Sequence, residues 1–376
     1  MSRAITIVGA SARAAASSAA RAGFAVYAAD LFADVDLRRD CQVAIATAYP
    51  DGLAQIVDGS QPGGWMYTGA LENHPSFVDE MAVIRPLWGN AGKVLREVRN
   101  PLKVADVLRG AGIPCPAVAR SSDSLSSDMR WLKKSLYSAG GAKVYRWNPR
   151  SEPPDCFADD YFQQYIEGQS CSAVYVADKR SDVLLGVTRQ LIGSAWAGAN
   201  GFRYTGSIGP ISLPDSVMSQ FVAIGSALAR AFGLVGLFGV DAIVNPEGVW
   251  SVEVNPRYTA STELLDLAFG FQAVALHVDA CESGTLPQAP LPFKGRCFGK
   301  AILFASKDFV ISPKLSAKLE AENGSKPARL ADIPVTGSII QAGWPVITLL
   351  AEATDEPTVI QSLQQSAAEI QSWWAG

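Results

Sequence analysis

Histidine is scarce in this sequence, which contains only His74 and His277 among 376 residues. Metal centres built on imidazole rings and Ser-His-Asp hydrolysis both need histidines beside neighbouring acids, so the scarcity disfavours both classes of site. His277 falls in the apolar segment LLDLAFGFQAVALHVDAC, which predicts one helix and a buried core histidine. Carboxylates, lysines and backbone groups must therefore carry any chemistry.

Paired cysteines, long apolar runs and clusters of basic residues are absent as well. The six cysteines include no CxxC pair, which argues against a zinc or redox motif and fits reduced thiols. No apolar run approaches the roughly 18 to 20 residues that span a bilayer, and MSRAITIVGA does not form a charged and then apolar leader. The formal net charge is -4 without a dense Lys/Arg run, which gives no reason to expect binding to nucleic acid or membrane. We therefore expect a cytoplasmic protein whose partners are small molecules.

The composition, with 48% hydrophobic and 18% charged residues, is that of a folded chain long enough for two or three domains. Strand and helix patterns alternate at the N-terminus and predict βαβ units with a parallel sheet, over residues 4–10, 11–22, 24–30, 43–47 and 64–74. A ligand would then lie beyond the strand ends, near Ser11, Asp30 and the loop ALENH. The dinucleotide fingerprint GxGxxG does not follow Gly9, so a dinucleotide site is disfavoured.

The rest of the chain predicts a β-rich body. A linker near residue 95 and a helix that begins at an Asn cap before Pro101 come first. Strands and further helices follow, over residues 131–147, 160–178, 183–193, 202–208, 215–233 and 356–374.

The segment GVDAIVNPEGVWSVEVNPR predicts two strands around a turn at NPEG. Asp241 would lie opposite or near Glu253, and Asn255 and Arg257 share the face of Glu253 because side chains alternate along a strand. Carboxylate and carbamoyl oxygens suit Mg²⁺, and a guanidinium beside them can clamp a phosphate. The alternative is an exposed hairpin with a surface ion pair of little worth.

Two further segments suit a nucleotide. In WLKKSLYSAGGAKV, a lysine (Lys134, or Lys133) ends a strand before a loop with paired glycines, and such a loop offers a cation and free N–H groups to phosphates. In YFQQYIEG, backbone groups and a carboxylate could hold adenine and ribose. Taken alone, either segment could also be purely structural.

These segments, in this order, resemble the ATP-grasp superfamily over residues 96–285. The lysine-glycine segment is similar to the family loop K-P-x-x-G-S-G-G. In this sequence Ser135 replaces the Pro of that loop, and Ser138 replaces its first Gly. One departure is that Pro101 stands where the family often has a lysine, and Lys103, about 200° further around the helix, would face away.

The resemblance implies ATP and Mg²⁺ (or Mn²⁺) as cofactors and assigns roles to named residues. Lys134 and Arg257 would be catalytic, and Asp241, Glu253 and Asn255 would bind the metal. The nucleotide would be held by Lys134, Ser138, Gly140, Gly141, Gln164, Tyr165, Ile166 and Glu167.

The fold class implied is α/β (α+β), an ATP-grasp fold with an N-terminal parallel-sheet domain and a β-rich C-terminal part. We expect an N-terminal domain over residues 1–95, a small subdomain that covers ATP over 96–167, and a large subdomain with the metal site over 168–376. The segment ADIPVTGSIIQAGWPVITLLAEA, with GALENH and LWGN, is similar to predicted carboligases related to biotin carboxylase, which occur with tetrahydromethanopterin-linked one-carbon metabolism.

The resemblance implies a ligase that phosphorylates a carboxylate with ATP and lets an amine or similar nucleophile displace the phosphate. It also suggests a place in the biosynthesis of a one-carbon carrier cofactor of the tetrahydromethanopterin or methylofuran type. Alternatives are bicarbonate activation of the biotin carboxylase kind and a nucleotide-binding scaffold without turnover. Arg189, Arg203, Glu72 and His74 are candidates for substrate binding, although strand arginines are as often solvated. A homodimer is considered for the assembly.

Overall fold

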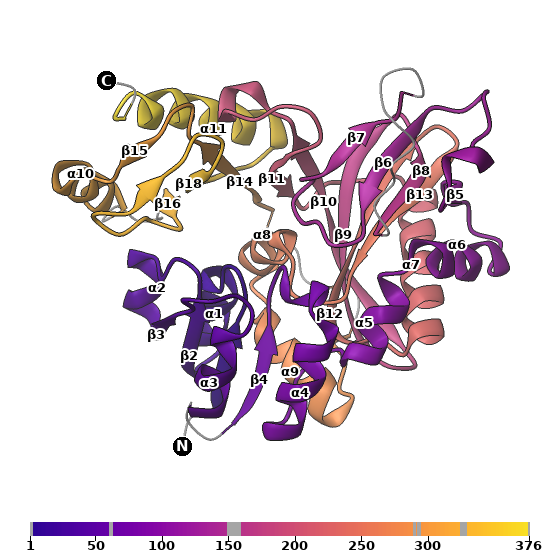
Figure 1. Cartoon of the computed structure of the whole chain (residues 1–376), viewed down its shortest axis with the longest axis horizontal. Helices are drawn as coiled ribbons and strands as arrows, with labels where there is room; N and C mark the ends of the chain where they lie inside the picture. The colour runs from indigo at the N-terminus through magenta and orange to yellow at the C-terminus, as the bar shows by residue number, and fades with distance from the viewer. Residues whose placement is uncertain are drawn as a thin grey trace.

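The computed structural model describes residues 3–59, 63–148, 159–288, 291, 295–323 and 329–374. Strands in this part of the chain form a four-stranded parallel sheet, an eight-stranded sheet, a four-stranded antiparallel sheet and a two-stranded ribbon. Figure 1 shows the parallel sheet in indigo at the lower left, the smaller antiparallel sheet at the upper right, and helix α8 between the N-terminal and C-terminal parts. The expected mixed α/β architecture is confirmed.

The N-terminal sheet has the strand order β3-β2-β1-β4, and its strands are parallel as the βαβ pattern predicted. Its elements are β1 (Ala4–Val8), α1 (Arg13–Arg21), β2 (Ala25–Asp30), α2 (Val35–Asp40), β3 (Gln42–Ile45), α3 (Gly52–Gly59) and β4 (Gly64–Tyr67). The short helix η1 (Leu71–Asn73), α4 (Pro75–Ile84) and α5 (Gly92–Val98) follow. Since all four strands run the same way, the loops after β1 and β4 meet at one edge of the sheet.

The small antiparallel sheet has the order β5-β8-β6-β7. It contains β5 (Val118–Ala119), η2 (Ser122–Ser124), β6 (Trp131–Ser135), β7 (Val144–Arg146) and β8 (Asp160–Gln164), preceded by α6 (Pro101–Gly110). The Asn100 side chain accepts a hydrogen bond from the Leu102 N–H at 3.1 Å, so the predicted Asn cap is present. The prediction of a linker near residue 95 is wrong, because residue 95 lies inside helix α5. The domain boundaries themselves stay predictions.

The eight-stranded sheet joins the middle and the C-terminus of the chain in the order β13-β12-β9-β10-β11-β14-β18-β16. Its strands are β9 (Gln169–Asp178), β10 (Asp182–Ile192), β11 (Tyr204–Gly209), β12 (Val235–Asn245), β13 (Gly248–Asn255), β14 (Cys297–Phe304), β16 (Leu330–Ala331) and β18 (Pro345–Ala353). The elements around it are η3 (Ala195–Ala197), α7 (Asp215–Phe232), α8 (Ala260–Phe269), α9 (Ala273–Ser283), α10 (Pro313–Asn323), α11 (Glu356–Gln371) and the ribbon of β15 (Phe309–Val310) with β17 (Ile339–Ile340). The predicted C-terminal strands thus extend the sheet that carries Asp241, Glu253 and Asn255, the residues predicted to bind a metal.

The hairpin of β12 and β13 contains a β-bulge. Asp241 pairs with Glu253, whereas the next residue, Ala242, pairs with Ser251, which leaves Val252 as an extra residue on β13. The Val252 carbonyl accepts a hydrogen bond from Nε2 of Gln163 at 3.1 Å. The hairpin predicted at NPEG is confirmed, and its bulge connects it to the small sheet.

The apolar segment after this hairpin forms two helices instead of the one predicted. Helix α8 ends at Gly270, which has φ 71°, and α9 starts a few residues later at an angle of 106° to it. In the described part of the chain, no single helix is both long enough and apolar enough to span a bilayer. Helices α8 and α9 taken together reach that length and apolar composition, but the chain bends sharply between them.

Strand β9 is buried on both faces, as expected for a central strand. Ala173, Tyr175 and Ala177 pack in the cluster that includes α7, and the Tyr175 ring stacks on Phe238 at 4.8 Å. Val174 and Val176 pack on the other face, in the cluster with α1 and α9. The sheet is therefore held from both sides, which fixes the positions of the side chains at its polar end.

His277 is a core residue, as predicted. Its Nδ1 accepts a hydrogen bond from the Leu237 N–H at 2.8 Å, and its Nε2 contacts the Trp88 carbonyl at 3.0 Å. Burial lowers the pKa of His277 to about 4, so the ring is neutral at neutral pH and has a structural role.

Candidate active site

A cavity of about 530 Å³ lies where the N-terminal sheet, the small sheet and the eight-stranded sheet meet. This volume falls in the range of roughly 300 to 1,000 Å³ that is typical of small-molecule sites. Most of the predicted site residues line it: Lys134, Ser138, Gly140, Gly141, Gln164, Tyr165, Ile166, Asp241, Glu253, Asn255 and Arg257. The structure thus brings together residues from three separate stretches of the chain.

Asp241 and Glu253 face each other across the hairpin at one end of this cavity. Oδ1 of Asp241 accepts a hydrogen bond from Gln190 Nε2 at 3.0 Å, and Oδ2 accepts one from Asn255 Nδ2 at 3.1 Å. Burial and the neighbouring Glu253 carboxylate raise the pKa of Asp241 to about 6. Two carboxylates held this close repel each other, and a divalent cation would relieve the repulsion.

The donor set at this position suits magnesium. Asp241, Glu253 and Asn255 supply hard oxygen atoms, and no group of three His, Cys, Asp or Glu side chains able to hold a metal occurs in the described ranges. So small a set of protein ligands is typical of Mg²⁺, which usually keeps waters and completes its shell with phosphate oxygens. In the present arrangement the Asn255 carbamoyl oxygen accepts from Arg257 Nη2 at 3.2 Å, so the amide would have to turn to offer that oxygen to a metal.

Arg99 also contacts Glu253, although no motif in the sequence marks this arginine. Its guanidinium donates to Glu253 Oε1 at 2.9 Å, to Asn73 Oδ1 at 2.8 Å and to the Leu136 carbonyl at 2.8 Å. Although burial opposes ionisation, Arg99 and Lys134 lower the pKa of Glu253 below its ordinary value. Arg99 therefore links the N-terminal domain, the start of the glycine loop and a candidate metal ligand.

Lys134 lies on the face of β6 that points into the cavity. Its Nζ donates to Gln163 Oε1 at 3.1 Å and lies 3.4 Å from the Val252 carbonyl, which the bulge presents. Although burial opposes the charge, Tyr161 and the carboxylates of Glu253 and Asp241 raise the pKa of Lys134, so it stays an ammonium. A buried cation at this point suits the phosphates of a nucleotide.

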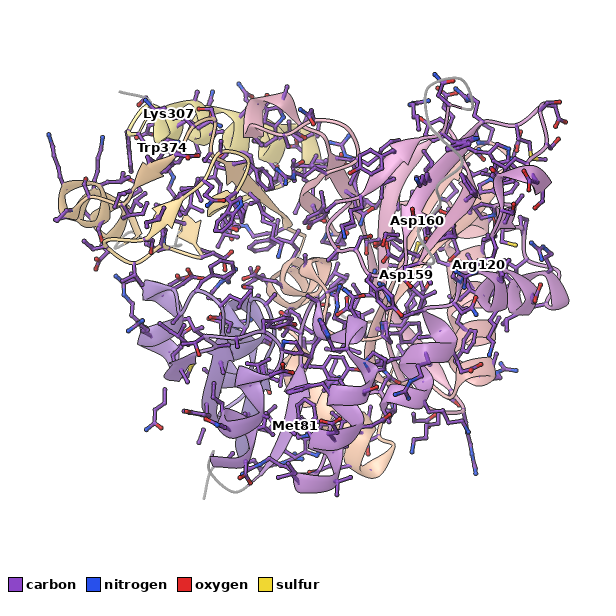
Figure 2. All side chains as sticks on the ribbon, viewed as in Figure 1. Met81, Arg120, Asp159, Asp160, Lys307 and Trp374 are labelled. Carbon is purple, nitrogen blue, oxygen red and sulfur yellow. The ribbon has the colours of Figure 1, made fainter. Side chains whose placement is uncertain are left out.

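Lys133 points to the opposite face of β6 because strand side chains alternate. Its Nζ lies 3.5 Å from Oδ2 of Asp160, the first residue of β8, which is labelled in Figure 2. Of the two lysines that the sequence left as alternatives, Lys134 is the one that lines the cavity.

The glycine loop after β6 folds back toward β11. The Gly140 carbonyl accepts a hydrogen bond from the Tyr204 N–H at 2.9 Å, and the Ser138 hydroxyl donates to the Ser135 carbonyl at 3.0 Å. Gly140 and Gly141 have φ angles of 61° and 75°, a region that residues with a Cβ rarely adopt. A Cβ at Gly141 would lie 1.9 Å from the Phe202 carbonyl oxygen, whereas one at Gly140 would meet nothing within 4 Å.

These two glycines allow a matched test of the loop. Both alanine variants carry the cost of the left-handed backbone, about 1 to 2 kcal/mol, but only Gly141→Ala must also displace the loop from Phe202. Since about 1.4 kcal/mol corresponds to a tenfold change in affinity, we expect Gly141→Ala to raise the KM for ATP by at least about tenfold and Gly140→Ala to raise it less. Steady-state kinetics with varied ATP measures the difference; equal effects of the two variants would contradict a phosphate-binding role for the loop.

The predicted adenosine end lies between the small and large sheets. Gln164 Oε1 accepts a hydrogen bond from the Ala117 N–H at 3.1 Å, and the Tyr165 ring lies beneath the Arg146 guanidinium at 4.3 Å. Tyr165 and Ile166 line the cavity. Glu167 does not, because its side chain is exposed and pairs with Arg130 at 2.8 Å.

Arg257 lies at the edge of the cavity and is held by Glu72. Its Nε donates to Glu72 Oε1 at 2.7 Å, and Glu72 is only 2% exposed. Glu72 therefore positions the guanidinium and does not itself line the cavity, contrary to its predicted contact with substrate. His74 is also outside the lining and lies edge-on to the Tyr49 ring at 5.6 Å.

The two strand arginines predicted to bind substrate lie elsewhere. Arg189 is adjacent in sequence to Gln190, which faces the cavity, and therefore points to the other side of the sheet, where its Nε lies 2.5 Å from Glu356. Arg203 donates to the Gly343 carbonyl at 2.6 Å and covers the Phe304 ring. Neither lines the cavity, so the substrate-binding role predicted for them is not retained.

A buried ion-pair network that the sequence did not suggest closes the opposite end of the cavity. Arg13 Nε donates to Asp332 Oδ1 at 2.9 Å, and Arg13 also forms a bidentate pair with Glu263. Lys300 Nζ donates to the same Glu263 at 3.0 Å. Although burial opposes ionisation, Arg13 and Lys300 lower the pKa of Glu263 well below its ordinary value. Arg13, Lys300 and Asp332 line the cavity, so this network forms one of its walls.

Comparison with known proteins identifies the fold. Residues 98–261 match the ATP-grasp domain family. An uncharacterized protein of Methanocaldococcus jannaschii is 22% identical over 392 residues, which cover 96% of this chain and 91% of that protein.

Two solved structures illustrate the likeness of the whole chain. Phosphoribosylamine–glycine ligase from Thermotoga maritima has a TM-score of 0.70 at 14% identity, covering 97% of this chain and 96% of its own. The biotin carboxylase domain dimer of Hydrogenobacter thermophilus 2-oxoglutarate carboxylase, in complex with MgADP, ADP and bicarbonate, has a TM-score of 0.68 at 14% identity, covering 97% and 89%. Residues 98–261 thus match the ATP-grasp domain that the motifs indicated, and the whole chain shares the fold of these two solved structures.

Proposed function

We propose that this protein is an ATP- and Mg²⁺-dependent ligase that activates a carboxylate as an acyl phosphate for attack by an amine or a similar nucleophile. The observation that carries the proposal is the convergence of Asp241, Glu253 and Lys134 in one cavity, with Arg257 at its edge. An exposed hairpin, the alternative weighed from sequence, would not bury these charges together. Such charges suit phosphoryl transfer, which depends on positioning and charge neutralisation more than on a protein nucleophile.

Each part of the cavity has a role in this proposal. Tyr165 and Ile166 would bind the adenosine, and the glycine loop with Lys134 would hold the phosphates. Mg²⁺, or Mn²⁺, held by Asp241, Glu253 and Asn255, would neutralise charge on the β- and γ-phosphates.

The chemistry has two steps that need no histidine. A carboxylate oxygen of the acid attacks the γ-phosphorus, and the bond to the β,γ-bridging oxygen breaks to release ADP. The amine then attacks the acyl carbon, phosphate leaves with the C–O bond electrons, and the amine loses a proton. Arg257, held by Glu72, would orient the acyl phosphate through its guanidinium.

Similar proteins support the proposed reaction class and also its alternative, the activation of bicarbonate. The Thermotoga maritima enzyme is by name a ligase that joins phosphoribosylamine and glycine, which is the pattern of an amine and a carboxylate. The Hydrogenobacter domain was solved with MgADP and bicarbonate, which keeps bicarbonate activation as a second candidate. That domain is also a dimer, in line with the homodimer considered for this chain. Two finer parts of the proposal rest on the sequence alone. A place in the biosynthesis of a one-carbon carrier of the tetrahydromethanopterin or methylofuran type follows from the sequence resemblance, and a cytoplasmic location follows from the composition and cysteine pattern.

The test is an assay of ADP release from MgATP by the full-length protein with a panel of amino acids, pterins and furan derivatives. Hydroxylamine, added as a trapping nucleophile, converts an acyl phosphate into a hydroxamate that is measured directly. We expect ADP and hydroxamate in equal amounts with the correct acid. ADP release that requires bicarbonate and biotin would favour the carboxylase candidate, and nucleotide binding without ADP release from any acid would favour a scaffold.

A further inference from the structure

We propose that the end of the cavity around Lys300 binds a second anionic group of the acid substrate, so that this acid is an elongated dianion and not bicarbonate. The inference rests on the proposed ligase function and names the substrate class for the same cavity. It starts from residues that neither the motif nor the family resemblance includes.

Lys300 is a buried cation whose hydrogen bonds are incomplete. It is 5% exposed, lies on β14 and lines the cavity. An ammonium has three N–H donors, and within the described residues Lys300 Nζ has one acceptor, Glu263 Oε2 at 3.0 Å. Burying a charge with unused donors is costly, so ligand oxygens facing Nζ would stabilise this arrangement.

The first turn of α8 lies beside Lys300 and adds positive potential. Ser261, in that turn, has its hydroxyl 2.8 Å from Thr188 Oγ1 and 3.4 Å from Ser207 Oγ, and Ser207 is the strand partner of Lys300. Ala260 and Ser261 both line the cavity. The Thr259 side chain caps the Thr262 N–H, so the N–H groups of Ala260 and Ser261 are the ones that carry the partial positive charge of this helix end toward an anion.

The acidic groups at this end are occupied mainly by Arg13. Glu263 accepts from two guanidinium nitrogens of Arg13 as well as from Lys300, and both oxygens of Asp332 accept from Arg13. Asp36 lies 3.6 Å from the same guanidinium. Lys300 thus shares its single acceptor, Glu263, with a second cation, and its remaining N–H donors are left for ligand oxygens.

The geometry of the sheet sets the length of the substrate. Three strands separate β12, which carries Asp241, from β14, which carries Lys300. Four strand spacings amount to roughly 19 Å. Ser172, Gln190 and Ser207 lie on the intervening strands. Bicarbonate is too short to reach from the metal site to Lys300, whereas an acid with a chain between two anionic groups can span the cavity.

Equilibrium binding tests this without knowledge of the natural substrate. The probes are the dicarboxylates suberate, dodecanedioate and hexadecanedioate, whose increasing length approaches the span from the metal site to Lys300. Each is compared by calorimetry with the monocarboxylate and the ω-amino acid of the same length. The full-length protein is first titrated with MgADP and then, saturated with MgADP, with each probe. The variants are Lys300→Met, Lys300→Arg to restore the charge, and Lys314→Met as a control at an exposed lysine of α10.

We expect at least one dicarboxylate to bind more tightly than both of its matched analogues. Lys300→Met should weaken that binding by about 10- to 100-fold, as for the loss of a hydrogen bond to a charged group. Lys300→Arg should recover part of the affinity, Lys314→Met should match the wild type, and none of the three should change MgADP binding.

Two results would overturn the inference: equal dicarboxylate binding by wild type and Lys300→Met, or tighter binding of the ω-amino acids, which would make Asp332 the recognising group. Failure of the proposed function gives a different result: the wild type would not bind MgADP. The dicarboxylates can be compared without nucleotide as well, so the two failures are distinguishable.

Discussion

Glu253→Gln is expected to abolish ADP formation while the protein stays folded. The substitution keeps the shape of the side chain and removes the carboxylate charge that faces Asp241 across the hairpin. Because the metal would then have one anionic ligand fewer at the phosphates, we expect kcat to fall at least about 10³-fold, or about 4 kcal/mol in the barrier. The assay is ADP release from MgATP with an acid that the wild type accepts.

Thermal unfolding separates this effect from a loss of structure. Glu253 pairs with Arg99 at 2.9 Å, and its side chain is 35% exposed to the cavity, so the lost ion pair should lower stability by no more than about 1 kcal/mol. Glu247→Gln, on the exposed turn of the same hairpin, is the matched control and should keep wild-type activity. Full activity of Glu253→Gln would refute the metal site.

Lys134→Met should have the second largest effect, in both kcat and the KM for ATP. Its Nζ is a buried cation that lines the cavity together with the two carboxylates, and the methionine keeps the apolar stem while removing the charge. Loss of one preorganised donor to a developing charge typically costs about 10²- to 10³-fold in kcat, and we expect a loss of this size. Steady-state kinetics with varied ATP gives both constants.

Lys133→Met is the control for this variant because the two lysines are neighbours on opposite faces of β6. Lys133 pairs with Asp160, so its loss can lower the melting temperature, but the KM for ATP should stay at the wild-type value. If instead Lys133→Met raises the KM and Lys134→Met leaves it unchanged, the assignment of the phosphate-binding lysine is reversed.

Local patterns account for the parts of the fold and site that could be predicted. The alternation of side chains on β13 and the NPEG turn are properties of adjacent residues, and they place Glu253 near Asp241 without knowledge of the rest of the chain. The same alternation would have excluded Arg189, because Gln190 faces the cavity and its neighbour cannot. The helix break at Gly270 had a signal too, since glycine often ends a helix in the left-handed conformation.

The missed residues are those whose partners are distant in the sequence. Arg13 meets Glu263 and Asp332 only because α1, α8 and the C-terminal strands converge. Arg99 reaches Glu253 from the end of α5. No periodicity or motif marks such pairs, because each is fixed by tertiary packing and not by its neighbours in the chain. Lys300 lies in an apolar strand, where a lone lysine was a signal that could have been noticed.

The β-bulge at Val252 determines which side chains meet in the cavity. If β12 and β13 continued in the register of their turn, Asp241 would be opposite the hydrocarbon side chain of Val252, and every later residue of β13 would change sides. The same β-bulge turns the Val252 carbonyl oxygen toward Lys134. A perfectly regular hairpin would gain ladder hydrogen bonds and would separate Asp241 from Glu253, so the irregular pairing is what brings together the two carboxylates of the proposed metal site.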